Sequence, residues 1–77
     1  MEFQKFIENF ASQFDETEVA ELTPETKFRD LQEWSSLLAL SVMAMADEEY
    51  NVALNGDDIR SSRTILDLYH VIHSKLS

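Results

Sequence analysis

Two adjacent serines, Ser35 and Ser36, are the residues of this chain best placed to do chemistry. They end a long polar stretch and open an apolar segment, where a helix is expected to begin. One serine is enough to cap a helix, because its oxygen accepts a hydrogen bond from a free backbone N–H. The second hydroxyl is then expected to be exposed at the positive end of the helix dipole. Because that end favours a phosphate group, the position suits a phosphodiester.

The other residues that could act chemically support neither a metal site nor a hydrolase. His70 and His73 are three positions apart and can share a helix face, but nothing at a supporting spacing adds ligands, so no metal site is predicted. A hydrolase that used the serine pair with His70 would need an orienting group and an oxyanion hole, and no such motif is visible. The chain has no cysteine, so it has no thiol of its own.

Charge and length limit the function further. The 77 residues include 6 basic and 15 acidic side chains, which gives a net charge of −9. That excess repels nucleic-acid phosphates and anionic membranes, and it favours partners with basic surfaces. No apolar run approaches the roughly 20 residues of a membrane span. Because no signal peptide is visible either, we expect a cytoplasmic protein, and a monomer.

The apolar pattern predicts an all-α fold, a small four-helix bundle with three main helices and one short helix. Residues 3–14 place Phe and Ile at helical spacing. Residues 15–33 lose this period and contain Pro24, so a long loop between the first two helices is expected. Trp34 is expected to anchor this loop over the core. The apolar residues expected to pin the loop are Val19, Leu22, Phe28 and Leu31.

The second helix is predicted from Ser35 or Ser36 to about Tyr50, and it is apolar on more than one side. Its far end, Asp47-Glu48-Glu49, is acidic and unfavourable for the helix dipole. A partner-binding face would explain that cost, although a solvated face is the more frequent cause of such a run. The residues expected to face the core are Leu37, Leu40, Met43, Ala44 and Tyr50. The residues expected partly off that face are Leu38, Val42 and Met45.

The last third of the chain carries two turn signals. Asn55-Gly56-Asp57-Asp58 predicts a turn, and residues 57–59 are expected to open one short helical turn. Thr64 is expected to cap the last helix, with Asp67 completing an acidic capping box.

The chain resembles the acyl carrier protein family over nearly all of residues 1–77, which implies a single carrier domain. The family's attachment motif, Asp-Ser-Leu at the start of the second helix, corresponds here to Ser35-Ser36-Leu37, after a Phe28-x-x-Leu31 entry. The segment from Met43 to Tyr50 resembles the family's acidic helix end, closed by an aromatic residue. Counting back from Tyr50 places Ser36 at the family's modified serine. Residues 64–68 resemble the opening of the family's last helix.

The resemblance implies that Ser36 receives 4′-phosphopantetheine from coenzyme A through a separate phosphopantetheinyl transferase. The thiol of this arm would hold acyl or aminoacyl groups as thioesters for loading and processing enzymes, and the protein itself would not catalyse. A bundle interior containing Phe6, Leu40 and Ile72 is a candidate shelter for a growing chain. The implied partner-binding residues are Leu37, Leu38, Ser41, Asp47 and Glu48.

Two departures from the family pattern favour a specialised biosynthetic pathway. Ser35 replaces the acid that precedes the modified serine, and Leu38 and Ser41 replace residues that are often acidic. Partners with apolar as well as basic docking surfaces are therefore expected. Fatty acid, polyketide and peptide carriers share this outline, so the cargo stays open. The alternative hypothesis is an acidic helical module that binds basic partners without being modified.

Overall fold

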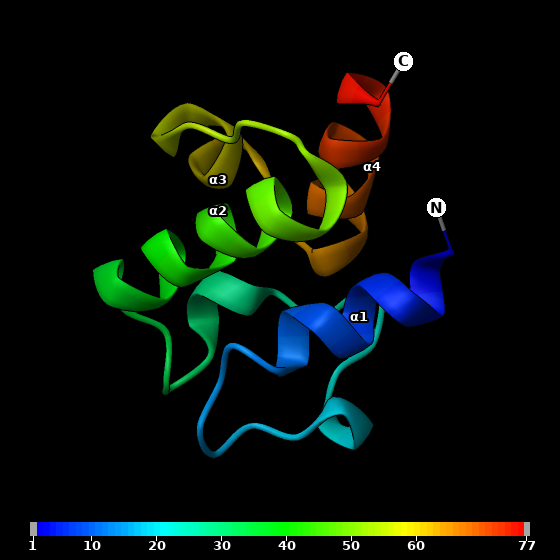
Figure 1. Cartoon of the computed structure of the whole chain (residues 1–77). Helices are drawn as coiled ribbons and strands as arrows, with labels where there is room; N and C mark the ends of the chain where they lie inside the picture. The colour runs from blue at the N-terminus through cyan, green and yellow to red at the C-terminus, as the bar shows by residue number, and fades with distance from the viewer. Residues whose placement is uncertain (1, 77) are drawn as a thin grey trace.

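The described part of the chain folds into four α-helices and two short 3-10 helices. Figure 1 shows how these elements are arranged in space. The structure is a computed structural model, and it describes residues 2–76. The predicted all-α bundle, with three main helices, one short helix and a long first loop, is confirmed. No helix in the described part of the chain is both long enough and apolar enough to cross a membrane. The elements are α1 (Phe3–Ala11), η1 (Val19–Glu21), η2 (Phe28–Asp30), α2 (Ser36–Tyr50), α3 (Gly56–Ser61) and α4 (Ile65–Lys75).

Helix α1 buries the predicted aromatic stripe but ends before residue 14. After Ala11 the backbone tightens, because the N–H groups of Gln13 and Phe14 donate to the carbonyls of Phe10 and Ala11 at 3.1 and 3.0 Å. Phe14 stays buried although it lies outside the helix. The spacing therefore predicted which residues are buried, but not where the helix ends.

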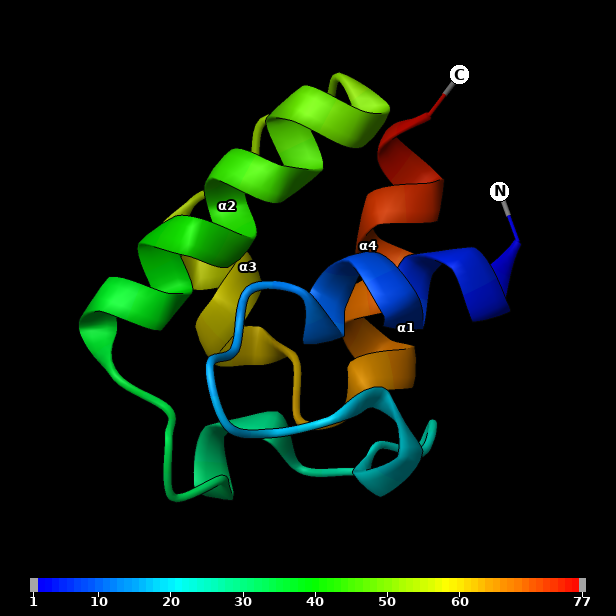
Figure 2. The ribbon, with the colours of Figure 1, turned by 60° about the horizontal axis from the view of Figure 1, so that its bottom comes forward.

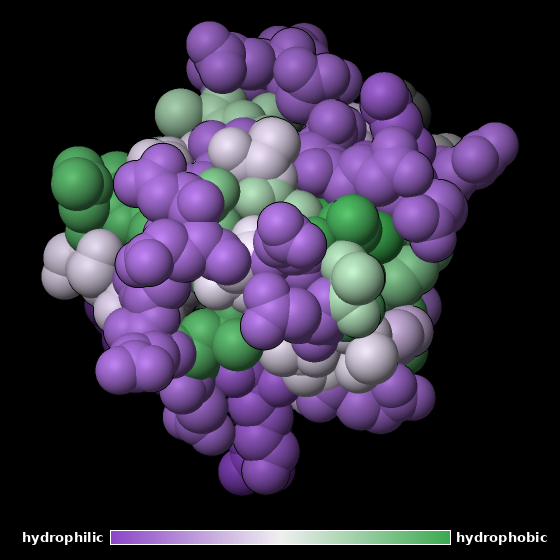
Figure 3. Space-filling model, turned by 90° about the horizontal axis from the view of Figure 1, so that it is seen from below, coloured by the Kyte–Doolittle hydropathy of each residue, from purple (hydrophilic) through white to green (hydrophobic). Residues whose placement is uncertain are grey.

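The long loop, residues 12–35, runs along the lower side of the bundle in Figure 2. Of the apolar residues expected to pin it, Leu22 and Phe28 are buried and Leu31 packs partly against the core. Val19 is 40% exposed and lies outside the core, so for this residue the expectation is wrong. Seen from below, the surface is mostly hydrophilic, with separate apolar patches (Figure 3).

The loop is also tied to the last helix by its backbone. The N–H groups of Ile65 and Leu66, in the first turn of α4, donate to the carbonyls of Thr26 and Pro24 at 3.1 Å each. These donors have no partner within their own helix, so the loop satisfies them. The side chain of Thr64 accepts the N–H of Asp67 at 3.1 Å, which confirms the predicted capping box. Helix α3 begins with a similar box in which Asn55 is the cap.

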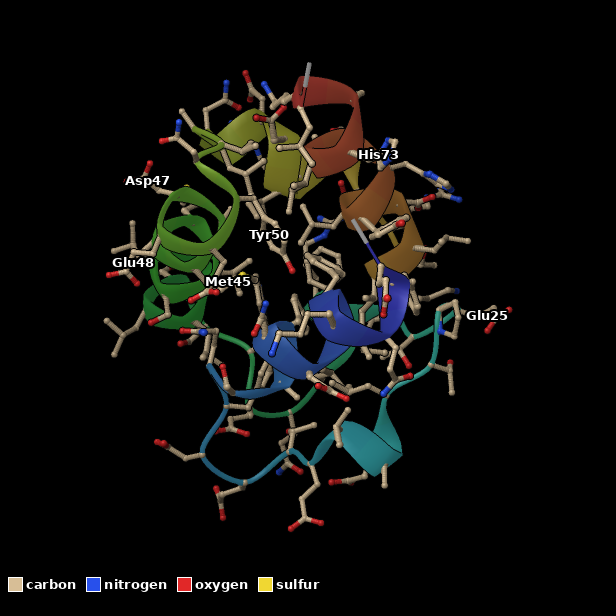
Figure 4. All side chains as sticks on the ribbon, turned by 45° about the vertical axis from the view of Figure 1, so that its right-hand side comes forward. Glu25, Met45, Asp47, Glu48, Tyr50 and His73 are labelled. Carbon is tan, nitrogen blue, oxygen red and sulfur yellow. The ribbon has the colours of Figure 1, made fainter. Side chains whose placement is uncertain are left out.

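The core face of α2 differs from the predicted one. The buried residues of the helix are Leu38, Val42, Met45 and Ala46. Leu37 and Leu40, predicted to be in the core, are 73% and 60% exposed, and Ala44 is exposed beside them. Met43 and Tyr50 pack partly against the core, so for them the prediction holds. Figure 4 shows Met45 and Tyr50 pointing into the bundle from this helix.

The error has a physical cause. The two apolar sets on α2 both follow helical spacing, so the period alone does not distinguish them. The acidic residues do not distinguish them either, because Glu48 lies one turn beyond the exposed Ala44 while Glu49 lies one turn beyond the buried Met45. Which set is buried is therefore decided by the packing of α2 against the other elements and not by the pattern of the helix alone.

Candidate functional site

The two serines occupy different positions at the start of α2. Ser35 is the N-cap: its backbone is extended, with φ −157° and ψ 172°, and its side-chain oxygen accepts the N–H of Leu38 at 3.2 Å. Ser36 is the first helical residue and is exposed. One serine therefore caps the helix, and the other presents its hydroxyl at the surface.

The Ser36 hydroxyl is free of hydrogen bonds to the part of the chain that the structure describes. A phosphate ester on this oxygen would lie beside the unpaired N–H groups of the first helical turn, where the helix dipole stabilises negative charge. Because the residue is exposed, an enzyme can reach the oxygen without opening the fold. The position therefore fits a covalently attached phosphopantetheine arm.

Trp34 fixes the chain immediately before the serines. Its ring lies 5.1 Å from that of Phe28 at an interplanar angle of 69°, and 6.3 Å from that of Phe14. Its backbone N–H donates to the carbonyl of Leu31 at 3.0 Å. These contacts confirm the predicted role of Trp34 as a loop anchor over the core, and they hold the entry to α2 in place.

The carboxylate of Glu33 fixes the far side of the same loop. It accepts the backbone N–H groups of Asp15 at 2.6 Å, Glu16 at 3.1 Å and Thr17 at 2.9 Å, and the Thr17 hydroxyl at 2.9 Å. Partial burial alone would raise the pKa of Glu33, but these hydrogen bonds outweigh that effect and hold the pKa below its usual range. The first residues of the loop are thereby bonded to the segment that ends at the serines.

An open groove of about 590 Å³ begins at the two serines and runs between α2, α3 and the end of the long loop. Its walls are largely apolar, and two guanidinium groups lie among them. Besides the serines, the groove is lined by the side chains of Arg29, Trp34, Leu40, Met43, Ile59 and Arg60. Sequence analysis did not single out Arg29 or Arg60, because they lie on η2 and α3 and are brought together only by the fold.

The residues predicted to bind partners divide into two groups. Leu37, Asp47 and Glu48 are exposed, and Figure 4 shows Asp47 and Glu48 projecting away from the bundle. Ser41 is partly exposed on the same helix. Leu38 is a correction, because its side chain is only 9% exposed and belongs to the core. The sequence placed it on the wrong side of α2.

The predicted interior shelter also needs correction. Phe6 and Ile72 are fully buried and packed in the core, as expected. Leu40 instead lies at the surface and lines the groove beside the serines. The apolar space nearest the attachment position is therefore a surface groove along α2.

The two histidines lie away from the serines, on α4. His70 and His73 are exposed, and their rings contact the ring of Tyr69 at 5.7 and 6.0 Å. No histidine lines the serine groove, so the geometry gives the hydrolase hypothesis no base. Among residues 2–76, no group of three His, Asp or Glu side chains is arranged to hold a metal ion.

Comparison with known proteins agrees with this geometry. The family model described as the phosphopantetheine attachment site matches residues 4–72, which is 69 of the 77 residues. Searches of curated proteins and of solved structures returned no match. Proteins of this family hold 4′-phosphopantetheine covalently and act as carriers. Because the match spans most of the sequence, the chain belongs to the phosphopantetheine attachment site family.

Proposed function

We propose that Ser36 is the attachment residue and that residues 1–77 form a single carrier domain for acyl or aminoacyl thioesters. In the attachment step, the Ser36 oxygen bonds to the phosphate of coenzyme A that carries pantetheine. The bond from that phosphate to the nucleotide half breaks, and the serine proton passes to the phosphopantetheinyl transferase. The observation that carries this proposal is the exposed, unbonded hydroxyl of Ser36, next to a serine already used as a cap.

The attached arm supplies a thiol, which this cysteine-free chain lacks. The protein's own residues contribute position rather than catalysis. Ser35 fixes the start of α2, and Trp34 and Glu33 fix the loop before it. A tethered acyl group is then presented to partner enzymes at a raised effective concentration.

Partner enzymes are proposed to dock along the outer face of α2. This face combines the apolar side chains of Leu37 and Leu40 with Ser41 and the carboxylates of Asp47 and Glu48. Apolar contacts near the attachment residue provide affinity, and the acids steer basic surfaces toward it. Because the part of the face nearest Ser36 is apolar and Ser35 replaces the family's acid, we propose a specialised biosynthetic pathway and a correspondingly narrow set of partners.

Intact-mass measurement tests the attachment. Wild type, Ser36→Ala and Ser35→Ala are each incubated with coenzyme A and a transferase of broad specificity. Wild type and Ser35→Ala are expected to gain one phosphopantetheine, and Ser36→Ala none. A loss confined to Ser35→Ala would move the site by one residue. Absence of any gain with several transferases would favour the unmodified acidic module that binds basic partners.

A second variant tests the departure from the family motif. Ser35→Asp restores the family's acid and keeps a side chain that can cap α2. Transferases that contact this acid are expected to modify Ser35→Asp faster than wild type. Equal rates with every transferase tried would show that Ser35 does not narrow the choice of enzyme.

A further inference from the structure

The groove beside Ser36 differs in charge from the rest of the molecule. The chain has 6 basic residues and a net charge of −9, yet two of the six, Arg29 and Arg60, line this groove. No carboxylate lies among the groove residues. Ser35, which lines the groove, stands where the family carries an acid, so this difference also leaves the groove without negative charge.

Both guanidinium groups are available to a ligand. Arg29 forms no ion pair with any residue of the described chain. Arg60 pairs with Asp57 on its own helix, but those side chains are 70% and 86% exposed. An exposed pair of this kind contributes little to stability, so an anion in the groove can replace Asp57.

Gly56 makes room for one of these groups. A Cβ atom built on Gly56 would lie 3.2 Å from Nη1 of Arg60, which is closer than ordinary van der Waals contact. The absence of a side chain therefore lets the Arg60 guanidinium lie against the start of α3, on the groove.

We propose that Arg29 and Arg60 bind an anionic group of the arm attached at Ser36. Guanidinium groups bind phosphate and carboxylate oxygens through paired N–H donors, so either group suits the site. Two parts of the loaded arm carry such oxygens: the phosphodiester next to Ser36, or a carboxylate at the end of the cargo. The second source would make acyl groups with a terminal carboxylate the preferred cargo. This inference rests on the proposed attachment at Ser36.

The experiment compares four forms of the protein: apo, loaded with the bare arm, and loaded from pentanoyl- or glutaryl-coenzyme A. The two acyl groups have the same number of carbons and differ in the terminal carboxylate. Intact mass verifies each form, and NMR of ¹⁵N-labelled arginine side chains and thermal unfolding report on the groove. Lys5→Gln is the matched control, because it removes the same charge from an exposed residue of α1 that lines neither this groove nor the neighbouring hollow that Arg29 shares with Arg63.

The expected result is a shift of the Arg29 and Arg60 Nε–H resonances that exceeds any shift at Arg63, which shares a neighbouring hollow with Arg29. The midpoint of unfolding is expected to rise by about 4 °C, a gain lost in an Arg29→Gln/Arg60→Gln variant and kept in Lys5→Gln. A response already present with the bare arm identifies the phosphodiester, and a response only with glutaryl identifies the cargo carboxylate. Unchanged resonances in every form, or an equal loss in Lys5→Gln, would overturn the proposal.

A variant at Gly56 and a titration of the apo protein complete the test. Gly56→Ala is expected to weaken the response of Arg60 and leave that of Arg29, because the added methyl group displaces the Arg60 guanidinium. If mass shows no attachment at all, the proposed function fails separately, and the apo protein is titrated with inorganic phosphate and with glutarate. Saturable shifts that are larger at Arg29 and Arg60 than at Arg63 would support the anion site, and their absence would reject it.

Discussion

The two ends of α2 differ in how the charges near them relate to the helix dipole. At the start, Ser35 satisfies a free N–H, and the arginines of the groove lie near the exposed Ser36. At the end, Asp47 and Glu48 place negative charge where the helix dipole is already negative, and no basic residue stands in the last turn. The charges at the end therefore oppose the stability of the helix.

The acidic end is held by other means. Asn51 ends the helix in the left-handed conformation, with φ 56°, and its N–H donates to the carbonyl of Asp47 at 2.9 Å. The ring of Tyr50 lies 6.2 Å from that of Phe6, and its hydroxyl accepts the side-chain N–H of Asn9 at 3.0 Å. Backbone geometry and aromatic packing thus support an end that electrostatics disfavours.

Phe28→Ala is the strongest way to break the start of α2. Phe28 is fully buried, and its ring lies 5.7 Å from Phe10 and 5.1 Å from Trp34, below the entry to the helix. Removing the ring should cost about 3–5 kcal/mol of unfolding free energy, measured by urea denaturation. Tyr50→Phe, at the other end, keeps its ring and should cost about 1 kcal/mol. Equal costs would contradict the different support of the two ends.

Glu33→Gln should release the loop before the serines. The carboxylate accepts more hydrogen bonds than Ser35 does, so we expect a larger loss than for Ser35→Ala, seen as faster hydrogen exchange at residues 15–17. The pKa of Glu33 is lowered in the folded state, so its contribution is complete above the unfolded value of about 4.3 and is lost as pH falls through the folded pKa.

The pH dependence separates this effect from a simple loss of packing. Wild type should lose the Glu33 contribution in acid, and Glu33→Gln should lack that part of the acid transition. Parallel stability curves for the two proteins between pH 7 and pH 3 would show that the carboxylate does not hold the loop.

Ser35→Ala and Ser36→Ala should separate the structural serine from the functional one. Loss of the cap in Ser35→Ala should cost about 1 kcal/mol, and Ser36→Ala should leave stability nearly unchanged, because its hydroxyl bonds to nothing in the described chain. Urea denaturation measures both. The opposite order would mean that the cap had been assigned to the wrong serine.

Neutralising the acidic end should have the smallest effect on stability. Asp47→Asn combined with Glu48→Gln should stabilise the fold by a few tenths of a kcal/mol per residue, since two unfavourable charges leave the helix end. The same variant should associate more slowly with a basic partner, as measured by stopped-flow kinetics. Glu2→Gln, at the start of α1, is a control that should not stabilise.

Because Leu37 and Leu40 supply apolar contact, the affinity of wild type for its partners should depend on salt less than for a carrier with an acidic face.

Much of the fold follows from local signals in the sequence. Thr64 with Asp67, and Asn55 with Asp58, are caps whose partners lie three residues apart, so they can be found by inspection. The serine at the start of α2 is predictable for the same reason. The buried face of α2 is harder to predict, because Leu37 and Leu38 fit the helical period equally well and acidic residues at the helix end lie in register with both.

The features of the site that were missed join distant segments. Glu33 binds backbone groups 16 to 18 residues away in an irregular loop, where no periodicity relates the two. Arg29 and Arg60 come from different elements and line one groove only in the folded chain. Local propensity contains no information about which distant residues share a surface, so the charge of the site could not be predicted from spacing.

The two backbone bonds between the loop and α4 bear on when the protein can be modified during its synthesis. They join Thr26 to Ile65 and Pro24 to Leu66, so the loop leading to the serines lacks these ties until the last helix has left the ribosome. We therefore expect attachment to follow completion of the chain, although Ser36 is synthesised before α4. A released chain that ends at Arg63 and accepted the arm as fast as residues 1–77 would refute this order of events.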